Sequence, residues 1–162
     1  MNRAALEALY VDLAPALATL AEPWCVIGSA AMMVAGAPVT DCPDLDIMTT
    51  GQGAEALEAA WALWRDADYA PDRAGQFRSR FSAYDFRAGR VEVMGDLLLR
   101  RDDAWRPVAL PEAVEARLGG LPVRIPAVEG QIALLEQFGR PKDLAKAAVL
   151  RALQTAVSSR KP

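Results

Sequence analysis

The feature that most constrains this chain is a short apolar run ending in glycine, followed by two aspartates inside a second apolar run. Residues 24–27 (Trp-Cys-Val-Ile) precede Gly28 and Ser29, an order typical of a buried strand that turns into a helix. Asp44 and Asp46 lie one residue apart in the second run. Because alternate side chains of a strand share one face, both carboxylates are predicted to point the same way.

Two neighbouring carboxylates repel each other unless a cation or a proton lies between them. Carboxylate oxygens suit Mg²⁺, which usually shares its remaining coordination positions with water and substrate phosphates. Gly28 would let a phosphate approach the backbone, and a helix starting there would offer free N–H groups, with the Ser29 hydroxyl as a further donor. The alternative is that Asp44 and Asp46 simply occupy a solvated strand face.

A third carboxylate joins this pair if the strands lie side by side. Residues 77–86 and 90–99 read as two strands of a hairpin joined by a turn that contains glycine. If the second strand pairs with that of Asp46, Glu92 completes a cluster that can hold one or two Mg²⁺ ions and suits in-line attack on phosphorus. Asp96 is the alternative third ligand. Without that pairing, Glu92 is a solvent-facing strand residue.

The remaining segments predict one α/β domain over residues 1–162, a small mixed sheet with flanking helices. Its core is expected over residues 24–126 and its C-terminal helices over 127–158. Apolar residues recur at helical spacing from residue 3 to 20, with a kink or two abutting helices at Pro15. Further helices are expected over residues 54–65, 128–138 and 141–157, a loop over 67–76 and a strand over 121–125, while 108–118 stay ambiguous.

Two local features determine where helices are expected to begin. Ser29 is the expected N-cap of a short helix that runs through Val34. Gly51 and Gly53 are expected to interrupt the chain, so that the following helix begins only at Ala54.

Composition narrows the class of protein further. The 162 residues carry a formal net charge of -3, which argues against a nucleic-acid binder that relies on a broad basic field. No run approaches the roughly 20 apolar residues of a membrane span, so we expect a cytoplasmic protein. The sequence has no histidine, which excludes Ser-His-Asp triads and histidine-ligated zinc. Cys25 and Cys42 have no metal-type spacing and are expected to be reduced thiols.

The motifs described above resemble a known family when they are taken together. An apolar strand ending in Gly28-Ser29, a short helix, Asp44 and Asp46 in a strand, and Glu92 in a later strand are similar to the nucleotidyltransferase superfamily with the polymerase-beta-like fold. The resemblance is closest to small bacterial members, namely antibiotic nucleotidyltransferases of the lincosamide type and minimal nucleotidyltransferases related to toxin–antitoxin and abortive-infection systems.

The resemblance covers about residues 24–98, together with residues 139–145 (Gly-Arg-Pro-Lys-Asp-Leu-Ala), which resemble a helix start that follows the core in many members. It implies a Mg²⁺-dependent enzyme that transfers a nucleoside monophosphate from an NTP, such as ATP, to an acceptor hydroxyl and releases pyrophosphate. The implied catalytic metal ligands are Asp44, Asp46 and Glu92, and the implied nucleotide-binding residues are Gly28, Ser29 and Lys142.

A second interpretation keeps the same fold without turnover. In it the chain is a catalytically degenerate module that binds a nucleotide, or a partner protein of the toxin–antitoxin type. A homodimer or a partner protein fits either interpretation, because antibiotic-modifying relatives usually carry a further acceptor-binding region or dimerise to make one. The acceptor, the preferred base and the oligomeric state stay open at this point.

Overall fold

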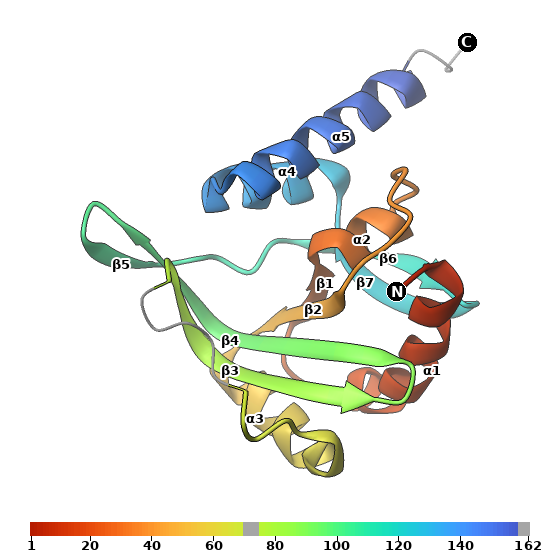
Figure 1. Ribbon diagram of the computed structural model, residues 1–162, viewed down its shortest axis with the longest axis vertical. Coiled ribbons are helices and arrows are strands. Elements are labelled where there is room, and N and C mark those ends of the chain that lie inside the picture. The colour runs from red at the N-terminus through yellow and green to blue at the C-terminus, as the bar shows by residue number, and fades with distance from the viewer. Residues whose placement is uncertain (70–74, 159–162) are drawn as a thin grey trace.

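A mixed β-sheet forms the centre of the molecule, and helices lie on both of its faces (Figure 1). The computed structural model describes residues 1–69 and 75–158, so residues 70–74 of the predicted loop lie outside it. The predicted α/β fold with a small mixed sheet is confirmed. The helices are α1 (Arg3–Thr19), α2 (Gly28–Val34), α3 (Gly51–Ala60), the short 3₁₀ turn η1 (Ala62–Trp64), α4 (Val128–Phe138) and α5 (Pro141–Ser158).

The strand order of the main sheet is β1-β2-β4-β3, with β5 paired to the far part of β4. The β2–β4 pair is parallel, and the other pairs of this sheet are antiparallel. A separate hairpin, β6–β7, packs beside β1. The strands are β1 (Trp24–Ile27), β2 (Asp44–Thr49), β3 (Phe77–Phe86), β4 (Gly89–Arg101), β5 (Ala104–Pro107), β6 (Ala113–Leu118) and β7 (Leu121–Pro126).

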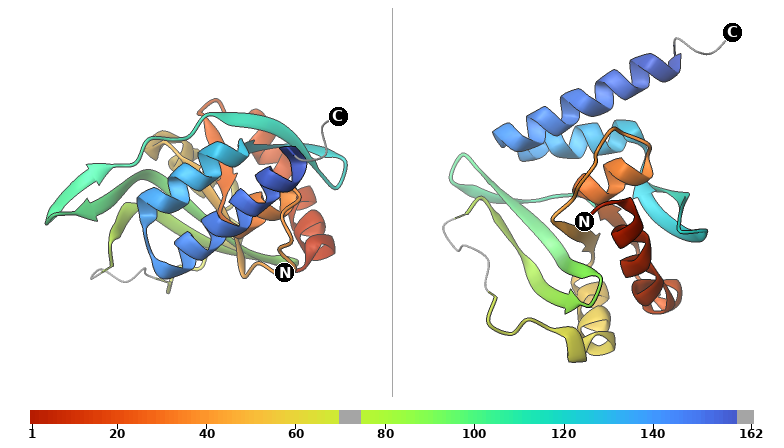
Figure 2. Two further views of the ribbon diagram at one scale, coloured as in Figure 1. Left: turned by 90° about the horizontal axis from the view of Figure 1, so that it is seen from above. Right: turned by 45° about the vertical axis from the view of Figure 1, so that its right-hand side comes forward.

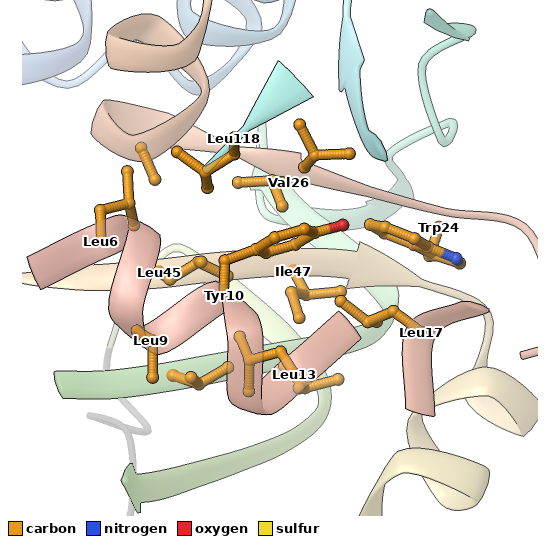
Figure 3. Packing of buried hydrophobic residues seen from close by; sticks show 14 of the residues in the cluster. Leu6, Leu9, Tyr10, Leu13, Leu17, Trp24, Val26, Leu45, Ile47 and Leu118 are labelled. Atoms are coloured by element: carbon orange, nitrogen blue, oxygen red, sulfur yellow. The ribbon is translucent and has the colours of Figure 1, made fainter. Parts of the chain in front are cut away.

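One face of the sheet carries the main hydrophobic core. Leu45 and Ile47 of β2 alternate with the aspartates and are fully buried against α1 (Figure 3). From α1, Leu9 and Leu13 point into this core, and the Tyr10 hydroxyl donates a hydrogen bond to the carbonyl of Pro122 in β7 at 2.7 Å. Strand alternation therefore places the aspartates on the opposite face, where they line a cleft together with residues of α4 and α5. Figure 2 shows these two helices over the sheet.

Several predicted elements are confirmed with their boundaries. Strands β1 and β2 begin and end where the apolar runs do, and the 77–86 strand forms the predicted hairpin with β4. Helix α4 covers residues 128–138 as predicted, and α5 begins at Pro141, whose missing N–H costs nothing at a helix start. Among the helices described, none combines the length and apolar composition that crossing a membrane requires.

Several predicted boundaries were wrong, among them the end of the helix predicted over 54–65, which stops at Ala60 and is followed by η1. Helix α1 continues through Pro15 as one helix, because the buried side chains of Leu13 and Leu17 on either side hold it against the core. Gly28 adopts a φ of +68° and turns the chain straight from β1 into α2, so Ser29 lies inside the helix and caps nothing.

Helix α3 begins at Gly51 rather than at Ala54. Its N-cap is Thr50, whose hydroxyl accepts a hydrogen bond from the N–H of Gly53 at 3.0 Å. The two glycines therefore belong to the first turn of the helix and do not interrupt the chain.

Candidate functional site

A cleft of about 290 Å³ lies between the sheet face that carries the aspartates and the helices α4 and α5. The sheet forms its floor, and the helices form its roof. Its lining combines charged and apolar side chains. Floor residues include Asp44, Asp46, Phe81, Glu92, Met94 and Leu97, and roof residues include Leu135, Phe138, Arg140, Lys142 and Lys146.

The parallel register of β2 and β4 brings the three predicted carboxylates into this cleft. Asp46 lies directly opposite Glu92, and Asp44 lies opposite Arg90. All three acids are partly buried and line the cleft. The pairing on which Glu92 depended is therefore present, and residues from two separate segments share one patch of the sheet.

The electrostatics of the patch are unfavourable for the ionised acids. Burial first, and then the negative charges of Asp44 and Glu92, raise the pKa of Asp46 to about 7, although Lys146 and Lys142 oppose the shift. Burial and the charge of Asp44 also raise the pKa of Glu92, while Arg90 lowers it. Such a cluster gains stability from a bound cation or from a shared proton.

Gly28 lies against this cluster because it has no side chain. A Cβ at this position would lie 2.6 Å from Oδ2 of Asp46, and the positive φ is a second reason for glycine. Gly28 lines the cleft as predicted. Ser29 is only 8 % exposed and is not part of the cleft lining, so the structure does not bring its hydroxyl to the site.

Two lysines of α5 form the positive side of the cleft. Lys142, which was predicted, and Lys146, which was missed, are one helical turn apart, and both line the cleft. Both lower the pKa of Asp46, which places their charges near the carboxylates. The spacing of four residues between Lys142 and Lys146 on a predicted helix was a signal that could have identified Lys146.

A buried ion pair connects the start of α5 to the floor of the cleft. Arg140 donates to both carboxylate oxygens of Asp143, at 2.6 and 3.0 Å, and Asp143 is 1 % exposed. The guanidinium carbon of Arg140 lies 4.6 Å from the ring centre of Phe77 in β3. The amide of Gln76 donates to the carbonyl of Phe138 at 2.8 Å, which holds β3 and the α4–α5 connection together.

Asp96 is not the alternative third ligand. The pairing of β3 with β4 shifts between Arg78 and Arg80, and Asp96 has a φ of +50°, so β4 contains a bulge at this point. The bulge turns the Asp96 carboxylate toward Gly51 at the start of α3, on the other face of the sheet. The residue after the bulge, Leu97, lines the cleft instead.

Arg90 contacts one of the three acids. Its Nε lies 3.6 Å from Oε1 of Glu92, and its other nitrogens donate to Asp66 at 3.0 Å and Asp85 at 2.9 Å. Its guanidinium also lies 4.4 Å over the ring of Tyr69, a residue of the cleft wall. Sequence reasoning missed this cation, because its partners come from three separate segments.

The carboxylates of Asp44, Asp46 and Glu92 have the chemistry of Mg²⁺ ligands, but they are not arranged around a common point. Within residues 1–69 and 75–158, no three acidic or cysteine side chains converge closely enough to hold a metal ion as they stand. The donor set is nevertheless three carboxylates, the ligand type that Mg²⁺ prefers.

Comparison with known proteins identifies the fold. No protein-family model and no curated protein matches the sequence. A crystal structure of a candidate nucleotidyltransferase from Thermotoga maritima aligns with a TM-score of 0.75 at 21% identity over 96% of both chains. The solution structure of the antibiotic-resistance factor ANT(2'')-Ia aligns with a TM-score of 0.58 at 15% identity, over 98% of this chain and 94% of that one.

A crystal structure of ANT(2'')-Ia in complex with adenylyl-2''-tobramycin aligns with a TM-score of 0.57 at 15% identity, over 94% of this chain and 91% of that one. These likenesses span nearly the whole of both chains. They establish that this chain has the nucleotidyltransferase fold, and they confirm that part of the sequence prediction.

Proposed function

We propose that this protein is a Mg²⁺-dependent nucleotidyltransferase that transfers a nucleoside monophosphate from an NTP to an acceptor hydroxyl. One observation carries the proposal. In a chain with the nucleotidyltransferase fold, Asp44, Asp46 and Glu92 face Lys142 and Lys146 across one cleft. Opposed carboxylates and lysines are the groups that a metal-bound triphosphate requires.

The positive side of the cleft binds the triphosphate in this proposal. Lys142 and Lys146 offset its negative charge, and Gly28 leaves space beside Asp46 in which a phosphate can approach the backbone. Asp44, Asp46 and Glu92 would hold Mg²⁺, which when bound would neutralise phosphate charge during in-line displacement.

The apolar side chains of the cleft would take the nucleoside. Met94 follows Glu92 on the same face of β4, and successive residues on one face lie about 6.6 Å apart. Leu97 and Phe138 continue the apolar lining beyond Met94. A nucleotide with its phosphates between the acids and the lysines therefore extends its sugar and base over these side chains.

Glu92 serves the acceptor in this proposal. A carboxylate that lines the cleft can accept the proton of a hydroxyl bound within reach of it. The acceptor oxygen attacks the α-phosphorus, the bond from that phosphorus to the pyrophosphate oxygen breaks, and the hydroxyl proton passes to Glu92. The adenylylated tobramycin bound to ANT(2'')-Ia is an example of the product class.

The direct test compares Asp46→Asn with the wild-type protein. Pyrophosphate release from each common NTP is measured with Mg²⁺ and a pool of hydroxyl acceptors. We expect more than about a 100-fold loss, because even residues behind metal ligands typically contribute 10–100-fold. Asp12→Asn, an exposed change on α1, is the matched control and should keep full activity. Equal activity of the wild-type and Asp46→Asn proteins contradicts the mechanism.

The second candidate function is a nucleotide-binding module without turnover. The contact of Glu92 with Arg90 favours it, since the three carboxylates do not converge as they stand. A module raises its melting temperature with Mg²⁺ and an NTP but releases no pyrophosphate. An enzyme does both, so the two measurements together separate the candidates.

A further inference from the structure

Arg90 and the three acids occupy one block of the sheet. Asp44 and Asp46 follow each other along one face of β2, and Arg90 and Glu92 do so on the adjacent β4. The register places Asp44 beside Arg90 and Asp46 beside Glu92. Adjacent strands are about 4.8 Å apart, so Glu92 can turn either toward its cross-strand neighbour Asp46 or along its own strand toward Arg90.

In the structure Glu92 is turned toward Arg90. Oε1 of Glu92 lies 3.6 Å from Nε of Arg90. The guanidinium itself is fixed from other sides, by Asp66 of the loop before β3, by Asp85 of β3 and by the face of Tyr69. Because Arg90 has these further partners, Glu92 is the member of the pair that is free to change its partner.

We propose that Arg90 is a positioning residue that holds Glu92 away from Asp46 in the metal-free protein. A divalent cation must replace Arg90 as the partner of Glu92 before three carboxylates converge. This accounts for the absence, among the residues described, of a three-ligand cluster beside acids of the right chemistry. The inference depends on the metal site of the proposed function, and it adds the residue that controls its affinity.

Metal binding without catalysis tests the inference. Mn²⁺ replaces Mg²⁺ in a titration followed by electron paramagnetic resonance, with wild-type protein and Arg90→Gln. We expect the variant to bind Mn²⁺ about three- to fivefold more tightly, which is the size of effect that a partly exposed ion pair supports. Arg78→Gln is the matched control, because Arg78 lines the same cleft but stacks on Trp105 rather than contacting an acid of the cluster.

A double-mutant cycle separates direct contact from the general effect of a lost positive charge. In a Glu92→Gln background, Arg90→Gln should no longer change the Mn²⁺ affinity. An undiminished effect in that background, or an equal effect of Arg78→Gln, overturns the inference. If wild-type protein binds Mn²⁺ and Arg90→Gln binds it no more tightly, the inference fails while the proposed function stands. If neither protein binds Mn²⁺, both fail.

Asp66→Asn provides a second variant should Arg90→Gln not fold. Asparagine keeps an oxygen that can accept from the N–H groups of Asp68 and Tyr69, as Oδ1 of Asp66 does, so the loop retains its turn. It no longer competes with Glu92 for the guanidinium. We expect Mn²⁺ binding to weaken about twofold, within the range of one exposed ion pair. Unchanged or tighter binding contradicts the inference.

Discussion

Gly28 and Asp46 show how a residue without a side chain makes room for a partly buried carboxylate. The carboxylate of Asp46 occupies the volume that a Cβ of residue 28 would need, at the point where β1 turns into α2. The same turn requires a positive φ. Backbone conformation and side-chain packing therefore both require glycine at this position.

Replacing Gly28 by alanine should destabilise the protein more than the same change at Gly36. Both residues have positive φ, but only at Gly28 would the new Cβ meet another atom. We expect a loss of about 1 kcal/mol from backbone strain at either position, with a further loss of similar size at Gly28. Urea unfolding measures both variants, and equal losses would show that the Asp46 carboxylate exerts no such restraint.

The pKa of Asp46 predicts how stability depends on pH. Its native value of about 7 lies above the ordinary value of 3.8, so the native carboxyl binds its proton more tightly than the unfolded one. The free energy of unfolding should therefore fall as pH rises from about 4 to about 7, and stay low above that. Replacing the Asp46 carboxyl by an amide should remove this pH dependence of the free energy of unfolding.

Asp46→Asn should accordingly stabilise the metal-free protein at pH 8. We expect a gain of about 1 to 4 kcal/mol in the presence of a chelator, since each unit between native and unfolded pKa corresponds to about 1.4 kcal/mol. The gain should shrink as pH falls toward 3.8, the ordinary value, because the native carboxyl is then protonated and the unfolded one is half protonated. Asp12→Asn is the control. If the two variants changed the free energy of unfolding equally, at pH 8 and at low pH, the raised pKa of Asp46 would be contradicted.

Helix α5 contributes two of the cations that line the cleft. Lys142 and Lys146 face the carboxylates, while Arg151 of the same helix pairs with Glu136 of α4. Lys146→Met should therefore weaken binding of Mg²⁺ with inorganic triphosphate about tenfold, the usual contribution of a hydrogen bond to a charged group. Arg151→Gln, tested in the same calorimetric titration, should have no effect. Similar losses from both variants would indicate only a long-range charge effect.

Elements whose boundaries depend on local signals could be predicted from sequence. Apolar runs between turn residues defined β1 and β2, and Pro141 marked the start of α5. Strand β5 could not be found, because its turn uses Asp102 and Asp103 with φ of 48° and 59°, a conformation that glycine or asparagine usually signals.

Side-chain direction within β4 was predicted only up to its bulge. Glu92 follows simple alternation and reaches the cleft, whereas Asp96 has an unpaired backbone position and turns to the other face. Alternation is a local rule, but a bulge depends on how the neighbouring strand is paired. For the same reason Arg90 was missed, since its partners Asp66, Asp85 and Tyr69 meet it only in the folded sheet.

For the whole molecule, the candidate site lies between the sheet and a helical roof. The buried face of the sheet packs on α1 and α3, which leaves the acidic face for the cleft (Figures 1 and 3). Contacts between hairpin and roof are few and specific, such as Phe77 edge-on to Phe138 with ring centres 4.9 Å apart. Sequence motifs predicted the three acidic residues. Their proximity depends on the strand order, which no local signal contains.

The central claim is that Asp44, Asp46 and Glu92 hold one divalent cation beside a triphosphate. The most direct measurement is a crystal structure with Mn²⁺ and a non-hydrolysable NTP, using the anomalous scattering of manganese to locate the ion. The account predicts an anomalous peak among the three carboxylates, with Glu92 released from Arg90 and the triphosphate facing Lys142. A bound nucleotide with no manganese among these residues, or with Glu92 still on Arg90, would contradict it.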